Sequence, residues 1–506
     1  MKKTLRPSGG HILDIDSLEI ADQYLSLAHN VHTRKGFPSR IGGRRVAYPV
    51  FGESALHLRN VQLNTFNWWL LFGSNFIKAV EGSNLHDITF PGQQTVSDIY
   101  EWTSDSLNGI PVFSNGRDPL LYWNGDAGSP AAVMPGWPVG QVCKAVCTFR
   151  FHVFALNISN AQGVFENMIV WSDAAEPGTI PQSWTPAPDN EAGSAFCADT
   201  PGPCIKGLPL GTQLMVYKRP AGLYAVEYQG QQPDNIFSVR PISRVIGALS
   251  PHCVLDLGTQ HLVVGNDDVV LTNGIAVTSI AENRIKRALA SAADEAGQLN
   301  TFVVRDLAQR EVWVCVPERG AQFATIAHIW DERRNTWVTR SLNNVRYATA
   351  GFVSDQTVDT TWNADEQVWN ADLSTWNAGA VSIAERVLTA EETALYVEDT
   401  FDSVVVTSRL MRTDLTMDDD EQIKVTQRVW IEGSGPGLAS VRFRLGARNS
   451  TDANVPITWG AFVSRQAGGK PYEVAGRFIS LEIVATTEQA WTIDRIVIEA
   501  RYDGTQ

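Results

Sequence analysis

The segment "HIWDERRNTWVTRS" (residues 328–341) carries the pattern that decides the fold. Runs of β-branched and aromatic residues flank the polar stretch "DERRN", whose aspartate and asparagine favour turns. Trp330 and Trp337 lie seven residues apart. A turn centred on Arg333 and Arg334 would place the two tryptophans opposite each other on one face of two antiparallel strands. The segment therefore predicts a tight β-hairpin that carries a tryptophan pair.

Similar strand signals recur along most of the chain, between glycine, proline, asparagine and aspartate residues. Helical periodicity is scarce, and its clearest candidate is residues 279–293. Loosely similar two-strand units recur at spacings of roughly 40–55 residues, a period typical of β-propellers. The pattern predicts a mainly β protein with a propeller of about six blades, and a pair of large β-sandwiches is the alternative. The units are Asn64–Thr89, Asp98–Gly125, Cys143–Trp184, Gly207–Ser243, His252–Ile280 and Asn300–Leu342.

The pattern changes after residue 385, where strands recur at roughly ten-residue spacing. In "VRFRLGAR" (residues 441–448) apolar residues alternate with arginines, so one face of the strand is apolar and the other polar. Such alternation predicts a β-sandwich-like platform domain. The predicted organisation is an N-terminal arm (1–45), a β-propeller-like domain (46–384) and a C-terminal platform (385–506).

Charge and hydropathy narrow the class of function. The net charge is −14, and the one dense basic stretch lies within residues 34–45. Proteins that grip nucleic acid usually present a basic face, because phosphate neutralisation supplies most of the affinity. We therefore expect duplex DNA to pass this protein without specific binding. No apolar run reaches the roughly 18–20 residues of a membrane helix, and the first residues lack the apolar core of a signal peptide. These features predict synthesis in the cytoplasm and no membrane insertion.

Motifs for catalysis and cofactor binding are absent from the sequence. It contains no Gly-x-Ser-x-Gly, no phosphate-binding glycine loop and no His-Glu-x-x-His. The nine histidines are scattered, and the Cys143–Cys147 pair has no second pair to complete a zinc site. We therefore predict a protein that is not an enzyme and that has no catalytic residue, metal or cofactor. A glycoside hydrolase stays as a distant alternative, because its two carboxylates leave no sequence motif.

A second tryptophan repeat occurs in "TWNADEQVWNADLSTWNAG" (residues 361–379), where Trp362, Trp369 and Trp376 are spaced by seven residues. Asparagine and glycine disfavour a helix here and favour turns. The stretch is interpreted as a duplicated hairpin, at the point where the propeller closes or meets a neighbour. Packing of the rings on one another is the first reading, and a subunit contact or a glycan platform are the alternatives.

Several stretches, taken together and in order, resemble the tail nozzle proteins of short-tailed bacteriophages, also called tail tubular, tail hub or DNA-stabilisation proteins. The resemblance runs in pieces from about residue 45 to 503. It rests on "IPVFSNGRDPLLYWNGD" (110–126), "IVWSDAAEPGTIPQSW" (169–184), "LPLGTQLMVYKRPAGLYAVEYQG" (208–230), "HLVVGNDDVVLTNGIAVTSIAENRIKRAL" (261–289), "VWVCVPERG…IWDERRNTWVTRSL" (312–342) and "GRFISLEIVATTEQAWTIDRIVIEA" (476–500).

The resemblance implies a structural protein of the virion. Such nozzles are similar to β-propellers with an added β platform, and they assemble as a hexameric ring beneath the adaptor ring on the portal. They continue the DNA channel, close it until ejection and hold tail fibres or spikes. The resemblance supplies no catalytic residues. The alternative is a propeller that presents aromatic loops to a glycan or a protein receptor.

The strongest acidic run is Asp418, Asp419, Asp420 and Glu421. In a nozzle, an acidic wall would repel duplex DNA and keep its residence short. We hypothesise that part of this run faces the channel or its mouth. The alternative is an ordinary solvated loop.

Overall fold

The computed structural model of the chain describes residues 1–48, 54–82, 84–231, 235–292, 297–354, 383–392, 394–400, 405–452 and 455–503. Strands make up 53% of the described residues and helices 4%, which confirms the prediction of a mainly β protein. Within the described residues the α-helix α1 covers Lys286–Ala292 and is shorter than predicted, because Ile280, Ala281 and Ile285 bury their side chains in a turn before it. Short 3-10 turns are η1 (Ile99–Glu101), η2 (Gly297–Asn300) and η3 (Pro436–Ser440).

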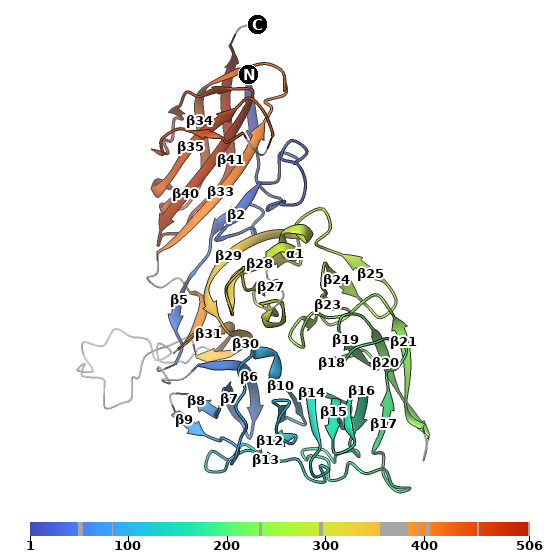
Figure 1. Cartoon of the computed structure of the whole chain (residues 1–506). Helices are drawn as coiled ribbons and strands as arrows, with labels where there is room; N and C mark the ends of the chain where they lie inside the picture. Colours follow the sequence, from blue (N-terminus) through green and yellow to red (C-terminus); the bar gives the residue numbers. More distant parts are fainter. Residues whose placement is uncertain are drawn as a thin grey trace, which may run out of the picture.

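Four-stranded antiparallel sheets follow one another around a ring (Figure 1). In each blade the first strand lies toward the ring axis and its successors lie progressively outward. The first four blades are β6 (Ala55–Leu63), β7 (Phe66–Gly73), β8 (Ile77–Glu81), β9 (Asn84–Asp87); β10 (Thr103–Leu107), β11 (Ile110–Ser114), β12 (Leu121–Tyr122), β13 (Ala132–Val133); β14 (Val142–Phe149), β15 (His152–Asn160), β16 (Gly163–Trp171), β17 (Gly193–Phe196); and β18 (Cys204–Leu210), β19 (Gln213–Lys218), β20 (Leu223–Gln231), β21 (Asn235–Ser243).

The ring continues with β22 (Val254–Asp256), β23 (His261–Val264), β24 (Val269–Thr272), β25 (Val277–Ser279); β26 (Phe302–Asp306), β27 (Glu311–Val316), β28 (Ala324–Asp331), β29 (Thr336–Val345); and β30 (Tyr347–Ser354), β31 (Ile383–Ala390), β32 (Leu395–Thr400), β5 (Gly43–Val46). Strand β30 packs against β6 and closes the ring. The predicted propeller of about six blades is confirmed. Among the described residues, six four-stranded sheets stand in the ring, and strands β26–β29 of a ten-stranded sheet fill the place between β22 and β30.

The neighbouring blades cover both faces of the second strand of a blade. The sequence of such a strand is accordingly a nearly continuous apolar run. In β7, "FNWWLLFG", the last six residues are buried, and all six residues of β27, "EVWVCV", are buried. A strand buried on both faces needs a continuous apolar run in place of alternation. These runs form the packing layers between the blades.

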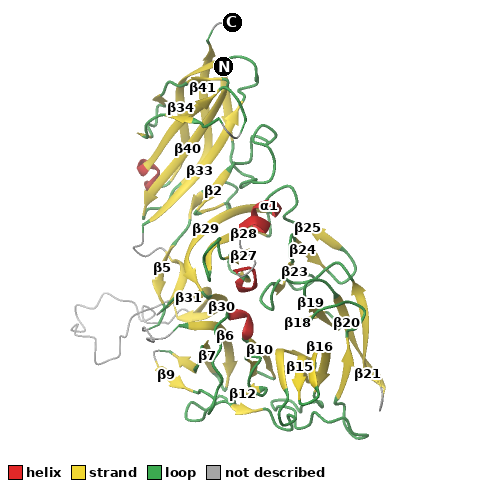
Figure 2. Ribbon diagram, viewed as in Figure 1, coloured by secondary structure: helices red, strands yellow, loops and turns green. Residues whose placement is uncertain are grey.

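The platform is a sandwich of two sheets that stands on the rim of the propeller, with both chain termini at its far end (Figures 1 and 2). One sheet is part of the ten-stranded sheet and the other has seven strands. In "VRFRLGAR" the apolar residues are buried and Arg442 is exposed, as the alternation predicts. The strands are β1 (Lys2–Leu5), β2 (Leu27–His29), β3 (Val31–His32), β4 (Ser39–Arg40), β33 (Val406–Leu415), β34 (Lys424–Ser434), β35 (Val441–Arg448), β36 (Thr458–Trp459), β37 (Val463–Ser464), β38 (Lys470–Pro471), β39 (Ala475–Gly476), β40 (Phe478–Thr487) and β41 (Thr492–Tyr502).

One continuous sheet joins the propeller to the platform. Strand β29, the outer strand of its blade, pairs in parallel with β2, and β2 pairs antiparallel with β33. Asn30 bonds to both neighbours of β2. Its backbone N–H donates to the carbonyl of Thr339 in β29 (2.7 Å), and its side-chain Nδ2 donates to the carbonyl of Thr407 in β33 (3.0 Å). The two bodies therefore share backbone hydrogen bonds.

These pairings correct the predicted domain boundaries. Residue 384 falls inside β31, and both β31 and β32 belong to the last blade, so the propeller reaches Thr400. Residues 43–45, assigned to the arm, belong to the outer strand β5 of the same blade. The rest of the arm pairs with the platform through β1 and with β29 and β33 through β2. The error has a physical cause, since local sequence pattern does not specify a strand's distant partner.

Candidate functional site

The predicted hairpin at residues 328–341 is confirmed. Trp330 and Trp337 are directly opposite each other on β28 and β29, with ring centroids 6.5 Å apart. The carboxylate of Asp331 accepts the backbone N–H groups of Arg333 (2.9 Å) and Arg334 (3.2 Å) and holds the turn. Both tryptophans are buried, with 5% and 0% of the residue exposed, so their role here is packing. Trp362, Trp369 and Trp376 lie outside the described residues.

The acidic run lies in the connection between β33 and β34, at the end of the platform that carries the chain termini. The ammonium group of Lys3 donates to the carboxylate of Asp418 at 3.0 Å. The carboxylate of Asp419 accepts the backbone N–H of Glu421 (2.8 Å), and Arg477 donates to the carbonyl of Asp420 (2.8 Å). Asp418, Asp420 and Glu421 are exposed. The hypothesis that this loop faces a DNA channel stays a prediction.

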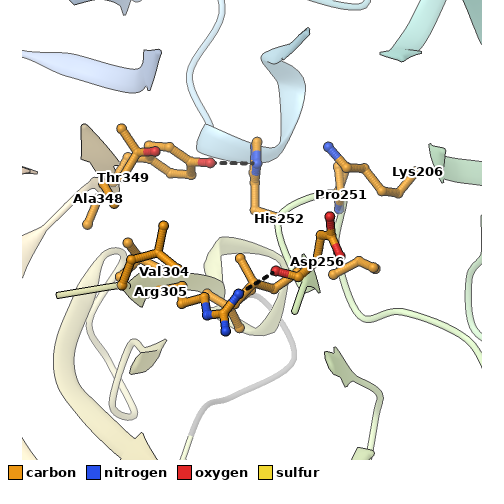
Figure 3. A pocket seen from close by; sticks show the side chains of 14 residues that line it. Lys206, Pro251, His252, Asp256, Val304, Arg305, Ala348 and Thr349 are labelled. Atoms are coloured by element: carbon orange, nitrogen blue, oxygen red, sulfur yellow. Dashed lines mark hydrogen bonds between the residues drawn. The ribbon is translucent and has the colours of Figure 1, made fainter. Parts of the chain in front are cut away.

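A pocket of about 260 Å³ lies near the propeller axis (Figure 3). Its walls come from four successive inner strands or the residues beside them: β18, β22, β26 and β30. The polar lining residues are Lys206, His252, Asp256, Arg305, Tyr347 and Thr349. Inner strands of a propeller converge on its axis, so residues far apart in the sequence meet here. This pocket is the candidate functional site.

His252 is held as a neutral ring on one wall of the pocket. Its Nε2 lies 2.9 Å from the carbonyl of Ile99, and its Nδ1 lies 3.3 Å from the hydroxyl of Tyr347. Burial, together with the nearby Lys206, lowers the pKa of His252 to about 3. A neutral imidazole that donates from Nε2 to the carbonyl offers only an acceptor at Nδ1. The Tyr347 hydroxyl therefore donates to His252.

Two arginines near the axis already have carboxylate partners. Arg305 donates from Nε and Nη2 to the two oxygens of Glu332, at 2.7 and 2.9 Å. Arg59, on β6, donates from Nη2 to Asp105 on β10 at 3.0 Å. In each pair the carboxylate neutralises the positive charge of the guanidinium. Neither guanidinium is left as a free cation.

Lys206 differs from both arginines. No hydrogen bond or ion pair joins its ammonium group to another described residue. Burial lowers its pKa; Asp105 raises it and Arg59 lowers it. In Figure 3 the side chain extends from its strand toward His252. Sequence reasoning missed this residue, because one lysine within the strand "CIKGLPL" looks like an ordinary outward-facing residue.

A second cluster of charged residues ties the N-terminal segment to the propeller. His32 lies between two carboxylates, with Nδ1 3.1 Å from Glu311 and Nε2 3.0 Å from Asp399. Arg34 binds the same two carboxylates, Glu311 from Nε (2.8 Å) and Asp399 from Nη1 (2.8 Å). The side chains of His32 and Glu311 are 4% and 2% exposed. We call these four residues the arm clasp.

The arm clasp predicts a pH dependence of stability. Burial alone would lower the pKa of His32, but Glu311 and Asp399 raise it to about 9. A raised folded pKa contributes stability that is complete below the unfolded value of about 6.5 and is lost as pH rises through 9. We therefore expect the free energy of unfolding to fall between pH 6.5 and 9, by up to about 1.4 kcal/mol per pH unit.

Urea unfolding at pH 6.5, 8 and 9 measures this dependence. In the variant His32→Gln, the free energy of unfolding should lose most of its dependence on pH. In His86→Gln, a change in β9 of the first blade, this dependence should remain. Equal slopes in the two variants would contradict the assignment.

Comparison with known proteins finds no matching protein-family model and no matching curated protein. Among solved structures, the crystal structure of the computationally designed Ika8 protein covers 71% of this chain and 100% of that chain, with 9% identity and a TM-score of 0.37. The crystal structure of BBS1N in complex with ARL6DN covers 71% of this chain and 96% of that chain, with 12% identity and a TM-score of 0.40. These similarities carry no argument about function.

Two further observations concern the described parts of the chain. None of their helices is long and apolar enough to cross a membrane. No group of three or more histidine, cysteine, aspartate or glutamate side chains within them could hold a metal ion.

Proposed function

We propose that this protein is a structural component of a bacteriophage tail. In this proposal it forms a hexameric nozzle or hub ring below the portal and adaptor, in the virion. The ring continues the DNA channel, closes it until ejection and anchors fibres or spikes. Duplex DNA crosses the lumen without specific binding.

The single observation that carries the proposal is the continuous sheet between propeller and platform, in a chain whose sequence resembles nozzle proteins. A ring subunit under load from packaged DNA must keep its two bodies in fixed relation. Backbone pairing of β29, β2 and β33 gives such a connection, because a hinge there would break several ladder hydrogen bonds at once. The net charge of −14 agrees with a channel that DNA passes without adhering.

The oligomeric state tests this proposal. We expect native mass spectrometry to find a hexamer of the 55.6 kDa chain, either alone or after mixing with the portal–adaptor complex of the same phage. Electron microscopy should then show a closed ring, since heterologous contacts that close produce cyclic symmetry. A chain that stays monomeric at micromolar concentration with the cognate portal–adaptor complex would overturn the proposal.

The alternative is a binding module that presents a glycan or receptor site. The axial pocket favours this alternative, since convergent polar groups in a concave site are typical of ligand sites. Glycan-array binding by the monomer, with no assembly on the portal–adaptor complex, would favour it over the nozzle.

A further inference from the structure

No carboxylate of the described residues pairs with the ammonium group of Lys206. The carboxylate of Asp105 acts on Lys206 from a distance, but both of its oxygens are engaged elsewhere. One oxygen of Asp105 accepts from Arg59 at 3.0 Å. The other accepts the backbone N–H of Thr148 at 2.8 Å and its hydroxyl at 3.0 Å. Lys206 is half-buried in the wall of the pocket, so a partner for its ammonium group has to come from the pocket itself, and an anion fits this position.

The backbone around Lys206 sets this position. The pairing of β18 with β19 is irregular between Cys204 and Lys206, and such bulges redirect a side chain. The next residue, Gly207, lets β18 approach β14 closely, since a Cβ there would lie 2.2 Å from the sulfur of Cys147. The strand therefore cannot relax away from the axis without losing its packing on the preceding blade.

Apart from the exposed Asp256, the remainder of the pocket is apolar, neutral or already paired. Arg305 is paired with Glu332, and His252 is neutral. The carboxylate of Asp256 accepts the backbone N–H of Gly258 at 2.6 Å, and it is not among the charges that act on Lys206. Apolar walls complete the cavity: Val254, Val303, Val304, Leu307, Ala348 and Ala350. One cationic end and several apolar walls select a small molecule with one anionic group.

We propose that the axial pocket binds a small organic anion, with its carboxylate or phosphate group on the ammonium of Lys206 and its body against the apolar wall. The volume of about 260 Å³ is at the lower limit of ligand sites, so the ligand is small. This site is independent of ring assembly, and its test uses the chain in whatever oligomeric state it adopts.

Isothermal titration of the full chain with acetate, butyrate and inorganic phosphate tests the proposal. We expect saturable binding of at least one probe in the millimolar range, weakened at least tenfold in Lys206→Met. Lys144→Met is the matched control, because Lys144 is an exposed lysine on the neighbouring inner strand β14, and it should bind as the unmodified chain does. Lys206→Gln serves as a second variant if Lys206→Met does not fold.

The probes distinguish the two kinds of anionic group. Butyrate binding about tenfold more tightly than acetate would indicate a carboxylate with an apolar body, because each buried methylene favours binding. Tighter binding of inorganic phosphate than of either acid would indicate a phosphate group. An absence of saturable binding up to 20 mM for all three probes, or binding that survives both Lys206 substitutions, would overturn the proposal.

Thermal unfolding without ligand gives an independent readout. Removing an unpaired, partly desolvated cation should leave the melting temperature of Lys206→Met equal to or above that of the unmodified chain. A marked fall would mean that the ammonium has a stabilising partner within the protein, and this would also overturn the proposal.

Discussion

Replacing Glu311 with glutamine is expected to lower the free energy of unfolding by about 3–5 kcal/mol, the usual cost of removing one partner from a buried ion pair. Glu311 accepts from both cations of the arm clasp, His32 at 3.1 Å and Arg34 at 2.8 Å. With glutamine, Asp399 alone faces two buried positive charges. Because Glu311 belongs to β27 and both cations belong to the N-terminal segment, this segment should also become sensitive to limited proteolysis.

Urea unfolding followed by tryptophan fluorescence at pH 7 measures the change. The matched control is Glu227→Gln, which breaks an ion pair with Arg240 whose side chains are 29% and 50% exposed. Exposed pairs contribute about 0–1 kcal/mol, so this variant should unfold almost as the unmodified protein does. Equal effects of the two substitutions would show that the arm clasp adds nothing to stability. A double variant, Glu311→Gln with Arg34→Met, should cost less than the sum of its single changes.

Replacing Trp337 with alanine is expected to cost about 3–5 kcal/mol, as large-to-small changes of buried aromatic residues do. Trp337 is fully buried, and its indole N–H donates to the carbonyl of Ile280 at 2.9 Å. Its own carbonyl accepts the backbone N–H of His11 at 2.9 Å. The substitution therefore opens a cavity where two blades and the N-terminal segment meet, and it removes the donor for Ile280.

Trp337→Phe separates the two contributions. The phenyl ring keeps much of the apolar contact and loses the indole N–H, so this variant should lose about 1–3 kcal/mol for the unpaired carbonyl and reduced packing. Trp430→Ala, at a half-buried tryptophan of the platform, is the control and should cost less than either change. Trp337→Ala unfolding at the same urea concentration as Trp430→Ala would contradict the assigned packing role.

Much of the fold follows from short-range pattern. The hairpin of residues 328–341 needs only its two strand runs, its Asp331 turn and the seven-residue spacing of its tryptophans. The alternation in "VRFRLGAR" predicts a strand with one buried face, and the structure has it. Both features depend on contacts within about ten residues, where the period of side-chain direction decides what is buried.

The arm clasp and the axial pocket depend on long-range contacts. Neither could be predicted from the sequence pattern. The basic stretch that contains Arg34 looks like a solvated surface when it is viewed alone. Within it, the Arg34 side chain is only 17% exposed, because Glu311 and Asp399 approach it from distant strands. Lys206 is one lysine in an apolar strand until the ring places it beside the axis.

The amino-acid sequence by itself determined the strand content, the turns, the repeat of blade-sized units and the change to a platform, because all of these are consequences of local side-chain periodicity. Only the tertiary structure decided which strands close the ring, where the propeller ends and which charges are paired. Residues 43–46 complete a blade whose other strands begin at Tyr347. The local sequence of these residues does not indicate that they pair with β32. Burial and counter-charge are properties of the closed ring, since they depend on which distant strand takes the neighbouring place.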